Sequence, residues 1–517
     1  MTAFDAFRGL VRDRTKPAAE QIVSGVMALI TSAQLQPGAR LPPIRALAAL
    51  LGVNRNTVAK AYQELAERGF VRSRFGGGSV VARPPARPVA AAAPANGNGQ
   101  ARGTGQTRFS EQDWTRRFAQ HLSVMEQGQA GALNLEQDPI NLFQLRPHTA
   151  LFPSELFRKC LNAVLRRQPG ALLNYGAPAG YLPLREAIAA RLQAQGITAG
   201  AGEILITSGS QQGIDLVARA LLDPGDGVVV ESPMYSIARK IFLVNGARLL
   251  PYALSPEGLD LGALERAPGR PAKLFYAVPN FQNPTTYTYT AEERAALLAL
   301  AYQAGSVVME DASGQELHGD AAAFPALAAL DASGRVIHLN TFSKTLIPAV
   351  RVGYLAGAAP VVRKLTELKE MTDLSHSLIM QAATAEFMER GHFDAHVARM
   401  RGFYWGRIAL AADMLAAALP PEVTFSDPRG GLCIWVDLPA ALDADVAARR
   451  LADRGVLVSP AGLYQPLQGG RNGFRLCVSF ESEARLARGI GIIGEELGRL
   501  LRRRPAVAVS REYQAMH

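Results

Sequence analysis

The residues that point most directly to chemistry are a lysine, an aspartate and an arginine in the middle of the chain. Lys344 follows Ser343 and precedes Arg351 by seven residues, and Asp311 ends an apolar run thirty-three residues upstream. A lysine amine forms a Schiff base with an aldehyde, an aspartate keeps a pyridine nitrogen protonated, and an arginine pairs with a phosphate. Binding of pyridoxal 5'-phosphate (PLP) needs these three groups, so the set predicts that cofactor.

A second anion-binding pattern precedes this set. Residues 207–212 read Thr-Ser-Gly-Ser-Gln-Gln, follow an apolar run and open a helical stretch. Backbone amides at a helix N-terminus, together with a serine hydroxyl, form a site for a phosphate. A serine that only caps its helix gives the same local pattern. The motif therefore supports a phosphate site only together with the other motifs along the chain.

Short apolar runs alternate with helical stretches from Tyr175 onward. Such runs are typical of strands buried on both faces of a mainly parallel sheet, which predicts an α/β fold. Asp311 ends one run, and ligands of open α/β sheets bind at the carboxyl ends of strands. From about Asp373, long helices and two more apolar runs indicate a smaller C-terminal α+β domain. The predicted strands are residues 204–206, 228–230, 274–276, 307–309, 336–339, 432–436 and 474–478.

Short motifs succeed one another in a fixed order along this part of the chain, namely Asn174-Tyr175-Gly176, residues 207–212, Pro233-Met234-Tyr235, residues 279–285, Asp311, Ser343-Lys344, Arg351 and Arg475. In that order they resemble the fold-type I aminotransferases, particularly the 2-aminoadipate aminotransferase group, over about residues 135–500. The resemblance implies that Lys344 and Asp311 are catalytic, holding PLP as a Schiff base and pairing with its ring nitrogen. Arg475 would bind the substrate carboxylate, with Arg239 as a second candidate. The remaining cofactor contacts it implies are Asn283 at the ring 3'-oxygen, Tyr235 stacked on the ring, Gly209, Ser210, Gln211, Thr341, Ser343 and Arg351 at the phosphate, and Tyr175 from the other subunit.

Two positions depart from the aminotransferase pattern. The aminotransferases place a tyrosine shortly after the aspartate, whereas here Ala312, Ser313 and Gly314 follow Asp311. Thr286 also replaces the usual glycine after Asn-Pro-Thr. We therefore expect the chain to bind the cofactor but to catalyse transamination slowly or not at all.

The N-terminal segment carries most of the net charge. Residues 1–88 hold 13 Lys and Arg against 5 Asp and Glu, which is +8 of the chain's +10. A compact basic segment beside a nearly neutral body is typical of proteins that bind a nucleic-acid backbone. A solvated basic face would give the same balance, so charge alone does not decide.

Helical spacing predicts three helices in this segment, at about 17–33, 44–51 and 54–69, with Asn54 capping the third. Residues 70–73 and 79–81 flank a run of glycines, which predicts a β-hairpin and hence a winged helix-turn-helix. Residues 41–62 closely resemble the GntR-type winged helix; a winged helix used only for protein contacts is the alternative. The third helix would enter the major groove. The residues expected to contact DNA are Arg55, Asn56, Thr57 and Lys60 on that helix, and Arg45, Arg72 and Arg74 at phosphates or the minor groove.

Composition is that of an ordinary globular protein of 517 residues, 48% of them hydrophobic. Cys160, Cys433 and Cys477 are far apart and predict neither disulfides nor a metal site. The start has no apolar signal-like region, and no run reaches the roughly 20 apolar residues that a membrane span needs. We therefore expect a cytoplasmic protein without membrane contact.

The chain accordingly divides into a winged helix-turn-helix at 10–83, a flexible linker at 84–108, an aminotransferase-like PLP-binding domain at 109–502 and a loose tail at 503–517. This arrangement resembles the MocR subfamily of GntR regulators. The resemblance implies a homodimer that binds double-stranded DNA and responds to an amino acid or amine through an external aldimine on PLP. Two alternatives stay open, a working PLP-dependent aminotransferase with an accessory DNA-binding domain, and a DNA-binding protein whose body only dimerises.

Overall fold

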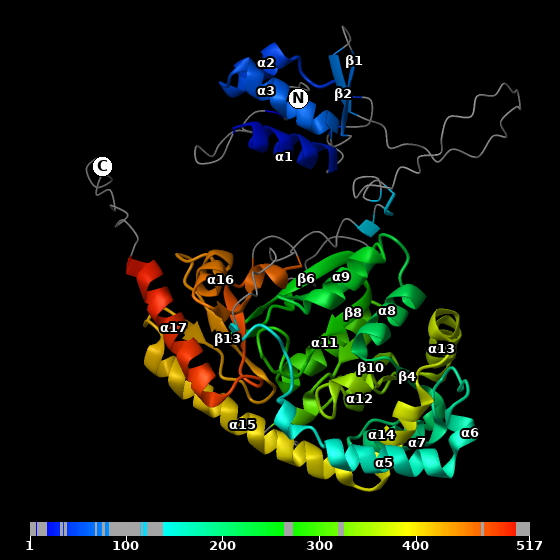
Figure 1. The fold of residues 1–517 in the computed structure, drawn as a ribbon. Coiled ribbons are helices and arrows are strands. Elements are labelled where there is room, and N and C mark those ends of the chain that lie inside the picture. The colour runs from blue at the N-terminus through cyan, green and yellow to red at the C-terminus, as the bar shows by residue number, and fades with distance from the viewer. Residues whose placement is uncertain are drawn as a thin grey trace, which may run out of the picture. The chain divides into compact units, whose positions relative to one another are not determined.

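The computed structural model describes residues 7, 18–31, 35, 39–67, 70–74, 78–81, 114, 117–119, 121–122, 138–262, 272–318, 325–466 and 470–502. The chain divides into two compact units, Met1–Arg108 and Phe109–His517, which Figure 1 colours from blue to red. The predicted linker at 84–108 and tail at 503–517 lie outside the described residues.

The N-terminal unit consists of three helices and a hairpin, α1 (Ala18–Thr31), α2 (Ile44–Leu51), α3 (Arg55–Glu67), β1 (Val71–Arg74) and β2 (Gly78–Val81). β1 and β2 pair antiparallel. Ile22, Leu47 and Val58, one from each helix, are fully buried in a shared apolar core. The Asn54 side chain accepts a hydrogen bond from the Asn56 backbone N–H (2.9 Å) and so caps α3. The predicted winged helix-turn-helix is confirmed.

An eight-stranded sheet forms the centre of the second unit, in the order β4-β11-β10-β9-β8-β5-β6-β7. The five adjacent strands β10, β9, β8, β5 and β6 are parallel to one another, whereas β11 is antiparallel to both β10 and β4, and β7 is antiparallel to β6. The predicted mainly parallel sheet is therefore confirmed. The strands are β4 (Ile204–Thr207), β5 (Gly227–Ser232), β6 (Arg248–Ser255), β7 (Gly258–Leu259), β8 (Ala272–Ala277), β9 (Val307–Asp311), β10 (Val336–Thr341) and β11 (Gly353–Ala356).

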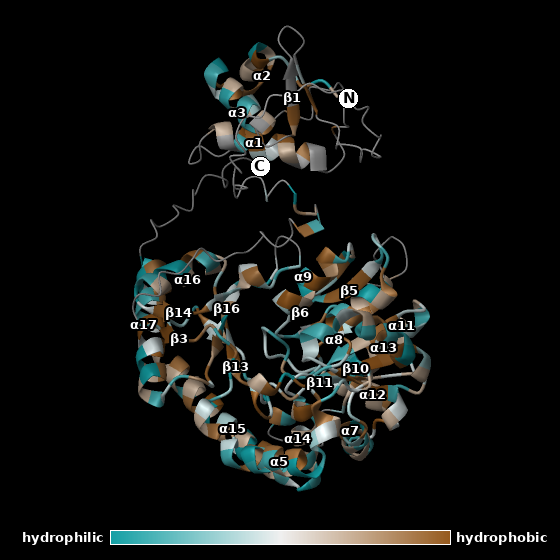
Figure 2. Cartoon of the chain, turned by 45° about the vertical axis from the view of Figure 1, so that its right-hand side comes forward, coloured by the Kyte–Doolittle hydropathy of each residue, from teal (hydrophilic) through white to brown (hydrophobic). Residues whose placement is uncertain are grey.

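Helices cover both faces of this sheet, and the alternation of strand side chains explains why. Val228, Val230 and Met309 belong to one apolar cluster, whereas Val229 and Val308 belong to another. β5 and β9 therefore bury both of their faces, as their apolar sequences predict. Figure 2 shows that the covering helices, α5 and α8 among them, carry both hydrophilic and hydrophobic residues. The helices of this part are α5 (Ser154–Arg167), α6 (Pro169–Leu172), α7 (Leu182–Ala194), α8 (Ser210–Leu221), α9 (Ser236–Val244), α11 (Ala291–Gln303), α12 (Leu327–Leu330), α13 (Ala359–Asp373) and α14 (Leu378–Glu389).

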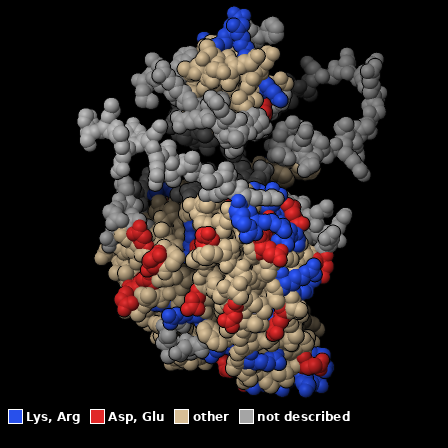
Figure 3. All heavy atoms as spheres, turned by 90° about the vertical axis from the view of Figure 1, so that its left-hand side faces the viewer, with Lys and Arg blue, Asp and Glu red and all other residues tan. Residues whose placement is uncertain are grey.

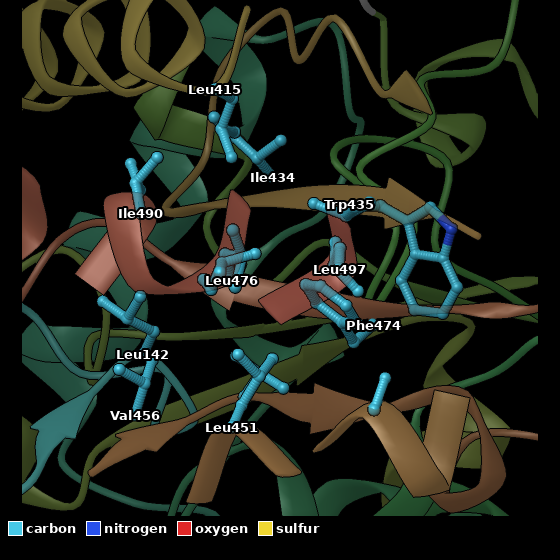
Figure 4. Close-up of a cluster of buried hydrophobic side chains, with 14 of the residues drawn as sticks. Leu142, Leu415, Ile434, Trp435, Leu451, Val456, Phe474, Leu476, Ile490 and Leu497 are labelled. Atoms are coloured by element: carbon cyan, nitrogen blue, oxygen red, sulfur yellow. The ribbon is translucent and has the colours of Figure 1, made fainter. Parts of the chain in front are cut away.

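The C-terminal part is a smaller α+β layer with its own core. A four-stranded antiparallel sheet has the order β12-β13-β16-β15, and β3 pairs with β14 beside it. Figure 4 shows Trp435 and Phe474 of this sheet, with Leu497 nearby, in a cluster of buried side chains. The elements are β3 (Ile140–Asn141), α15 (His392–Ala418), β12 (Thr424–Phe425), β13 (Cys433–Asp437), α16 (Ala444–Asp453), β14 (Val456–Leu457), β15 (Ser459–Pro460), β16 (Gly473–Cys477) and α17 (Glu483–Arg502).

Candidate cofactor and effector site

A cavity of about 370 Å³ lies where the carboxyl ends of the parallel strands meet. Asp311 ends β9, Thr341 ends β10, and the turn after β4 leads into α8. Because these strands are neighbours in one sheet, residues more than a hundred positions apart reach one cavity. The predicted site residues that line it are Ser210, Gln211, Tyr235, Asn283, Asp311, Thr341, Ser343, Lys344, Arg351 and Arg475.

Lys344 lies in the turn after β10, and its amine faces the cavity. The Lys344 Nζ donates a hydrogen bond to the backbone carbonyl of Leu145 (2.7 Å). Burial lowers the pKa of Lys344 to about 8, and the neighbouring positive charges of Arg475 and Arg351 add to that shift. A larger fraction of this amine is therefore neutral near pH 7 than of an exposed lysine, and the neutral amine is the nucleophile.

Asp311 is buried at the end of β9 with two hydrogen-bond donors. The Tyr276 hydroxyl donates to its Oδ2 (2.9 Å), and the Ser313 backbone N–H donates to its Oδ1 (3.1 Å). Burial raises the pKa of Asp311 above its usual value, and these hydrogen bonds oppose the rise. A cationic ring nitrogen beside this carboxylate would supply the charge partner that its buried position favours.

The turn between β4 and α8 forms a narrow cradle with Arg351. Gly209 has φ +88°, and a Cβ atom built on it would lie 2.9 Å from Arg351 Nη2. Only glycine therefore fits there without moving the guanidinium. Arg351 donates to the Ser208 carbonyl (2.7 Å), and the Thr341 hydroxyl donates to Ser343 Oγ (3.1 Å). Hydroxyls, a helix N-terminus and an arginine together suit a phosphate group.

Arg475 comes from β16 and reaches the cavity from the smaller domain. Its Nη1 donates to Asn283 Oδ1 (2.6 Å), and its Nη2 donates to the Phe143 carbonyl (2.8 Å). Arg475 Nε is buried and has no hydrogen-bond partner among the described residues. Its guanidinium also lies over the Tyr464 ring, 5.4 Å from the centroid. A planar cation with a free donor is suited to a carboxylate.

Three predicted residues lie elsewhere or beside the cavity. Gly209 belongs to the cradle but does not line the cavity, and Tyr175 is 81% exposed. Arg239 stands on α9, whose first residue Ser236 lines the cavity, but Arg239 itself does not. Its substrate-binding role stays a prediction that this geometry does not favour.

Sequence reasoning missed the segment that crosses the cavity before α5. Phe143 and Leu145 line the cavity, and their carbonyls bind Arg475 and Lys344. It also missed Tyr276, whose hydroxyl holds Asp311. No local motif marks these residues, since the contacts join positions up to 332 residues apart.

The N-terminal unit presents the predicted DNA-contacting residues of α2 and α3 at its surface. Arg45, Arg55, Asn56 and Lys60 are exposed, and Thr57 is half-buried. The Tyr62 hydroxyl donates to the Pro42 carbonyl (2.8 Å), which ties α3 to the chain before α2. Arg72 and Arg74 stand on β1, but their side chains are outside what the structure describes. Figure 3 shows lysine and arginine side chains on this unit's surface, with an acidic side chain beside one of them, and both signs intermixed on the body.

Family models match both units. "Bacterial regulatory proteins, gntR family" matches residues 18–81, and "Aminotransferase class I and II" matches residues 151–493. The transcriptional regulator TauR of Rhodobacter capsulatus is 33% identical over 480 residues, which cover 90% of this chain and 94% of TauR. The chain belongs to the MocR-like GntR regulators. It is a DNA-binding transcription regulator with an aminotransferase-like fold.

Other relatives fit the same membership. The probable rhizopine catabolism regulatory protein MocR of Rhizobium meliloti is 29% identical, covering 89% of this chain and 90% of its own. Among solved structures, the α-aminoadipate aminotransferase LysN of Thermus thermophilus has a TM-score of 0.68 and 30% identity. It covers 75% of this chain and 99% of its own, and was solved with N-(5'-phosphopyridoxyl)-L-leucine.

Gly314 and Thr286, where the sequence departs from the aminotransferase pattern, have different structural surroundings in this regulator. A Cβ atom on Gly314 would lie 4.0 Å from the Lys344 Cβ, so no side chain fills that space beside the lysine. Thr286 has φ +64°, a conformation that costs a β-branched residue about 1–2 kcal/mol. Its hydroxyl bonds to Ser426 Oγ (2.8 Å), which helps to hold the turn without glycine.

Among the described residues, no group of three or more His, Cys, Asp or Glu side chains could hold a metal ion. No helix in the described parts of the chain is both long and apolar enough to cross a membrane.

Proposed function

We propose that this regulator binds PLP and senses an amino compound through it. The observation that carries the proposal is the single cavity that gathers Lys344, Asp311, Arg351 and Arg475 in a chain with a GntR-type unit. When bound, PLP supplies a reactive aldehyde and an electron-withdrawing pyridine ring. The site residues fit that group, since the Gly209 cradle leaves room beside Arg351 and Asp311 is a buried carboxylate.

Each residue then has one task. Lys344 offers a partly neutral amine to the aldehyde, and Asp311 keeps a proton on the ring nitrogen. Arg351, Ser210, Ser343 and the Gly209 turn hold the phosphate. The remaining assigned roles are Thr341 and Gln211 at the phosphate, Tyr235 against the ring and Asn283 at its 3'-oxygen.

Arg475 anchors the carboxylate of the effector. In this structure, Arg475 is held by Asn283 and the carbonyl of Phe143. A carboxylate that takes the place of the Phe143 carbonyl, and an amine that takes the place of Lys344, would change what holds the segment at 143–145. Bound and unbound states would then differ in their contacts, which is the condition for a ligand to shift an equilibrium. The segment at 143–145 follows the residues that join the body to the DNA-binding unit.

The active form is a homodimer. Leu173, Tyr175, Met371 and Leu374 are large apolar side chains that are 56–81% exposed. The Gly176 N–H donates to Ser375 Oγ (3.2 Å), which joins the two stretches that carry them. We call these four residues the exposed apolar patch. Its covering by a second copy would bring a partner's tyrosine toward the phosphate cradle, and paired DNA sites need two winged helices.

Mixing the PLP-loaded protein with candidate amino acids in a single turnover tests the proposal against the working aminotransferase. Without a tyrosine at position 314, we expect a shift in cofactor absorbance and little or no conversion to the pyridoxamine form. Conversion at rates ordinary for metabolic enzymes, about 1–1000 per second, would support the aminotransferase instead. Protein that stays colourless with added PLP would favour the body that only dimerises.

A further inference from the structure

The charged residues that line the cavity are few, and each has a role in the proposed function. Of the residues that the structure describes, only Asp311, Lys344, Arg351 and Arg475 are charged and line it. Asp311 and Lys344 serve the cofactor ring and aldehyde, Arg351 serves the phosphate, and Arg475 serves one carboxylate. Among the lining residues that the structure describes, no cation is left for a second acidic group and no carboxylate for a second amine.

Large apolar side chains also line the cavity. Leu145, Phe281, Leu317 and Leu432 line it, and we call these four residues the apolar wall. Leu145, Leu317 and Leu432 belong to one hydrophobic cluster. The Gly431 N–H donates to the Leu317 carbonyl (3.0 Å), and a Cβ on Gly431 would lie 3.1 Å from the Phe281 Cβ. The wall is therefore continuous from Phe281 to the leucine cluster.

The wall borders the residues that would hold the reacting end of the effector. The Leu145 carbonyl accepts from Lys344 Nζ (2.7 Å), and the neighbouring Phe143 carbonyl accepts from Arg475 Nη2 (2.8 Å). An amino acid whose amine lies at Lys344 and whose carboxylate lies at Arg475 therefore has the wall within reach of its side chain.

Two charged residues next to the wall do not line the cavity, although the Glu316 Oε2 is buried without a hydrogen-bond partner among the described residues. Arg401 donates to the carbonyl of Glu316, the residue before Leu317, through its Nε (3.1 Å). Glu316 is buried and accepts from the Asn340 amide (3.0 Å). A charged side chain pressed against the wall would lose its hydration without gaining a partner, which is costly, whereas an apolar side chain would gain by leaving water.

We propose that the effector is an α-amino acid with one carboxylate and an apolar side chain, of the size of leucine rather than alanine. Dicarboxylic and basic amino acids are disfavoured by the same wall. This inference rests on the proposed function, because it names the kind of ligand that the PLP-loaded site takes.

The test titrates the full-length, PLP-loaded protein with L-leucine, L-alanine, L-glutamate and L-lysine. Cofactor absorbance gives the dissociation constants, and the thermal unfolding midpoint at saturating ligand is an independent measure of binding. We expect leucine to bind about tenfold or more tightly than the other three, a ratio that two to three buried carbon atoms can supply.

Tighter binding of glutamate or lysine than of leucine would overturn the inference and leave amino-acid sensing intact. Equal binding of leucine and alanine would also overturn it, since the wall would then contribute nothing. If PLP is bound and none of the four changes either signal, this inference is wrong, whereas the proposed function fails only if no other amino compound changes the cofactor absorbance.

A charge placed in the wall provides a second test. Leu145→Arg should raise the affinity for glutamate relative to leucine by about tenfold or more, because it adds the missing cation. Leu145→Gln, which has similar length and no charge, should not. An unchanged preference in a folded, PLP-binding Leu145→Arg protein would contradict the place assigned to the side chain. If that variant does not fold, the wild-type titration decides alone.

Discussion

Lys344 differs from an exposed lysine because burial has lowered the pKa of its amine to about 8. Only the neutral amine attacks an aldehyde, so the rate of PLP loading should rise with pH and level off above about pH 8. For an exposed lysine, the rise would continue toward its ordinary value of about 10.4. Stopped-flow absorbance on mixing the cofactor-free protein with PLP measures this profile. A rate that keeps rising steeply beyond about pH 9 would contradict the assignment.

Replacement of Lys344 separates Schiff-base formation from phosphate binding. Lys344→Ala should abolish the absorbance of the internal Schiff base, and borohydride reduction of the wild type should leave the pyridoxyl group on Lys344. Arg351→Ala should weaken PLP binding but keep the absorbance, because the hydroxyls and backbone donors of the cradle remain. An unchanged spectrum in Lys344→Ala would show that another amine holds the cofactor.

At this scale, the sequence predicted the residues that belong to motifs and missed those that do not. Asp311, Lys344 and Arg475 line one cavity because β9, β10 and β16 end or point there. Tyr276 and Phe143 were missed because their roles come from contacts formed only in the fold. A hydrogen bond from β8 to the end of β9, or across 332 residues, leaves no pattern in a local stretch of sequence.

The turn after β8 is supported by a buried carboxylate on β5. Glu231 accepts from the Val278 backbone N–H (2.7 Å) and from the Gln282 amide (2.8 Å) and is fully buried. Gln282 in turn precedes Asn283 of the cavity. Burial raises the pKa of Glu231 from 4.5 to about 7, although its hydrogen bonds oppose the rise.

An acid whose pKa is higher in the folded protein than in the unfolded chain stabilises the fold most at pH values at which the acid is protonated. The contribution of Glu231 is present below about pH 4.5 and is lost as pH rises through about 7, by up to about 3 kcal/mol. The wild type should therefore exceed Glu231→Gln in stability by more at about pH 5 than at about pH 8, since glutamine does not titrate. Denaturant unfolding at both pH values measures the difference. A stability difference between wild type and Glu231→Gln that is larger at the higher pH would contradict the predicted direction of the pH dependence.

Helix α3 is the element expected to distinguish DNA sequences. Arg55→Ala should cost about 1–3 kcal/mol on specific DNA and relax the preference at one base pair, if Arg55 reads a base edge. Arg45→Ala on α2 is the matched control, because a phosphate contact should weaken specific and random DNA alike and flatten the salt dependence. Titration of both variants against operator and random duplexes checks this. Equal losses for Arg55→Ala on both duplexes would exclude base reading.

Strands with a continuous hydrophobic pattern were predicted from the sequence, whereas strands that mix buried and exposed residues were not. Of the predicted strands, β4 and β10 are buried along their whole length, and the predicted parts of both are mainly apolar. β6 was missed because it is partly exposed along its length, and β11 because its four residues directly follow the Arg351 motif. The antiparallel direction of β11 depends on its pairing between β10 and β4, which only the assembled sheet decides.

At the scale of the whole molecule, we propose that the exposed apolar patch is an interface between two copies of the chain. Met371 and Leu374 are 78% and 56% exposed on and just after α13, close in sequence to Asp373, which accepts from the Gln212 amide of α8. The patch therefore borders the helix that begins at the phosphate cradle. Under this proposal, a second copy that covers the patch would lie next to the cofactor site, and cofactor binding and dimerisation would then be linked.

Charge in the patch tests this link. Met371→Glu combined with Leu374→Glu should shift the protein toward monomer in light scattering at micromolar concentration. Dimerisation would then bury two carboxylates in each subunit's half of the interface, which costs free energy. Binding of paired DNA half-sites should weaken with it, since a monomer offers one winged helix. Leu330→Glu is the matched control, as Leu330 is also exposed (44%) but lies on α12 outside the patch. A wild-type monomer with PLP bound, or a double variant that dimerises as the control does, would show that this surface does not join two copies.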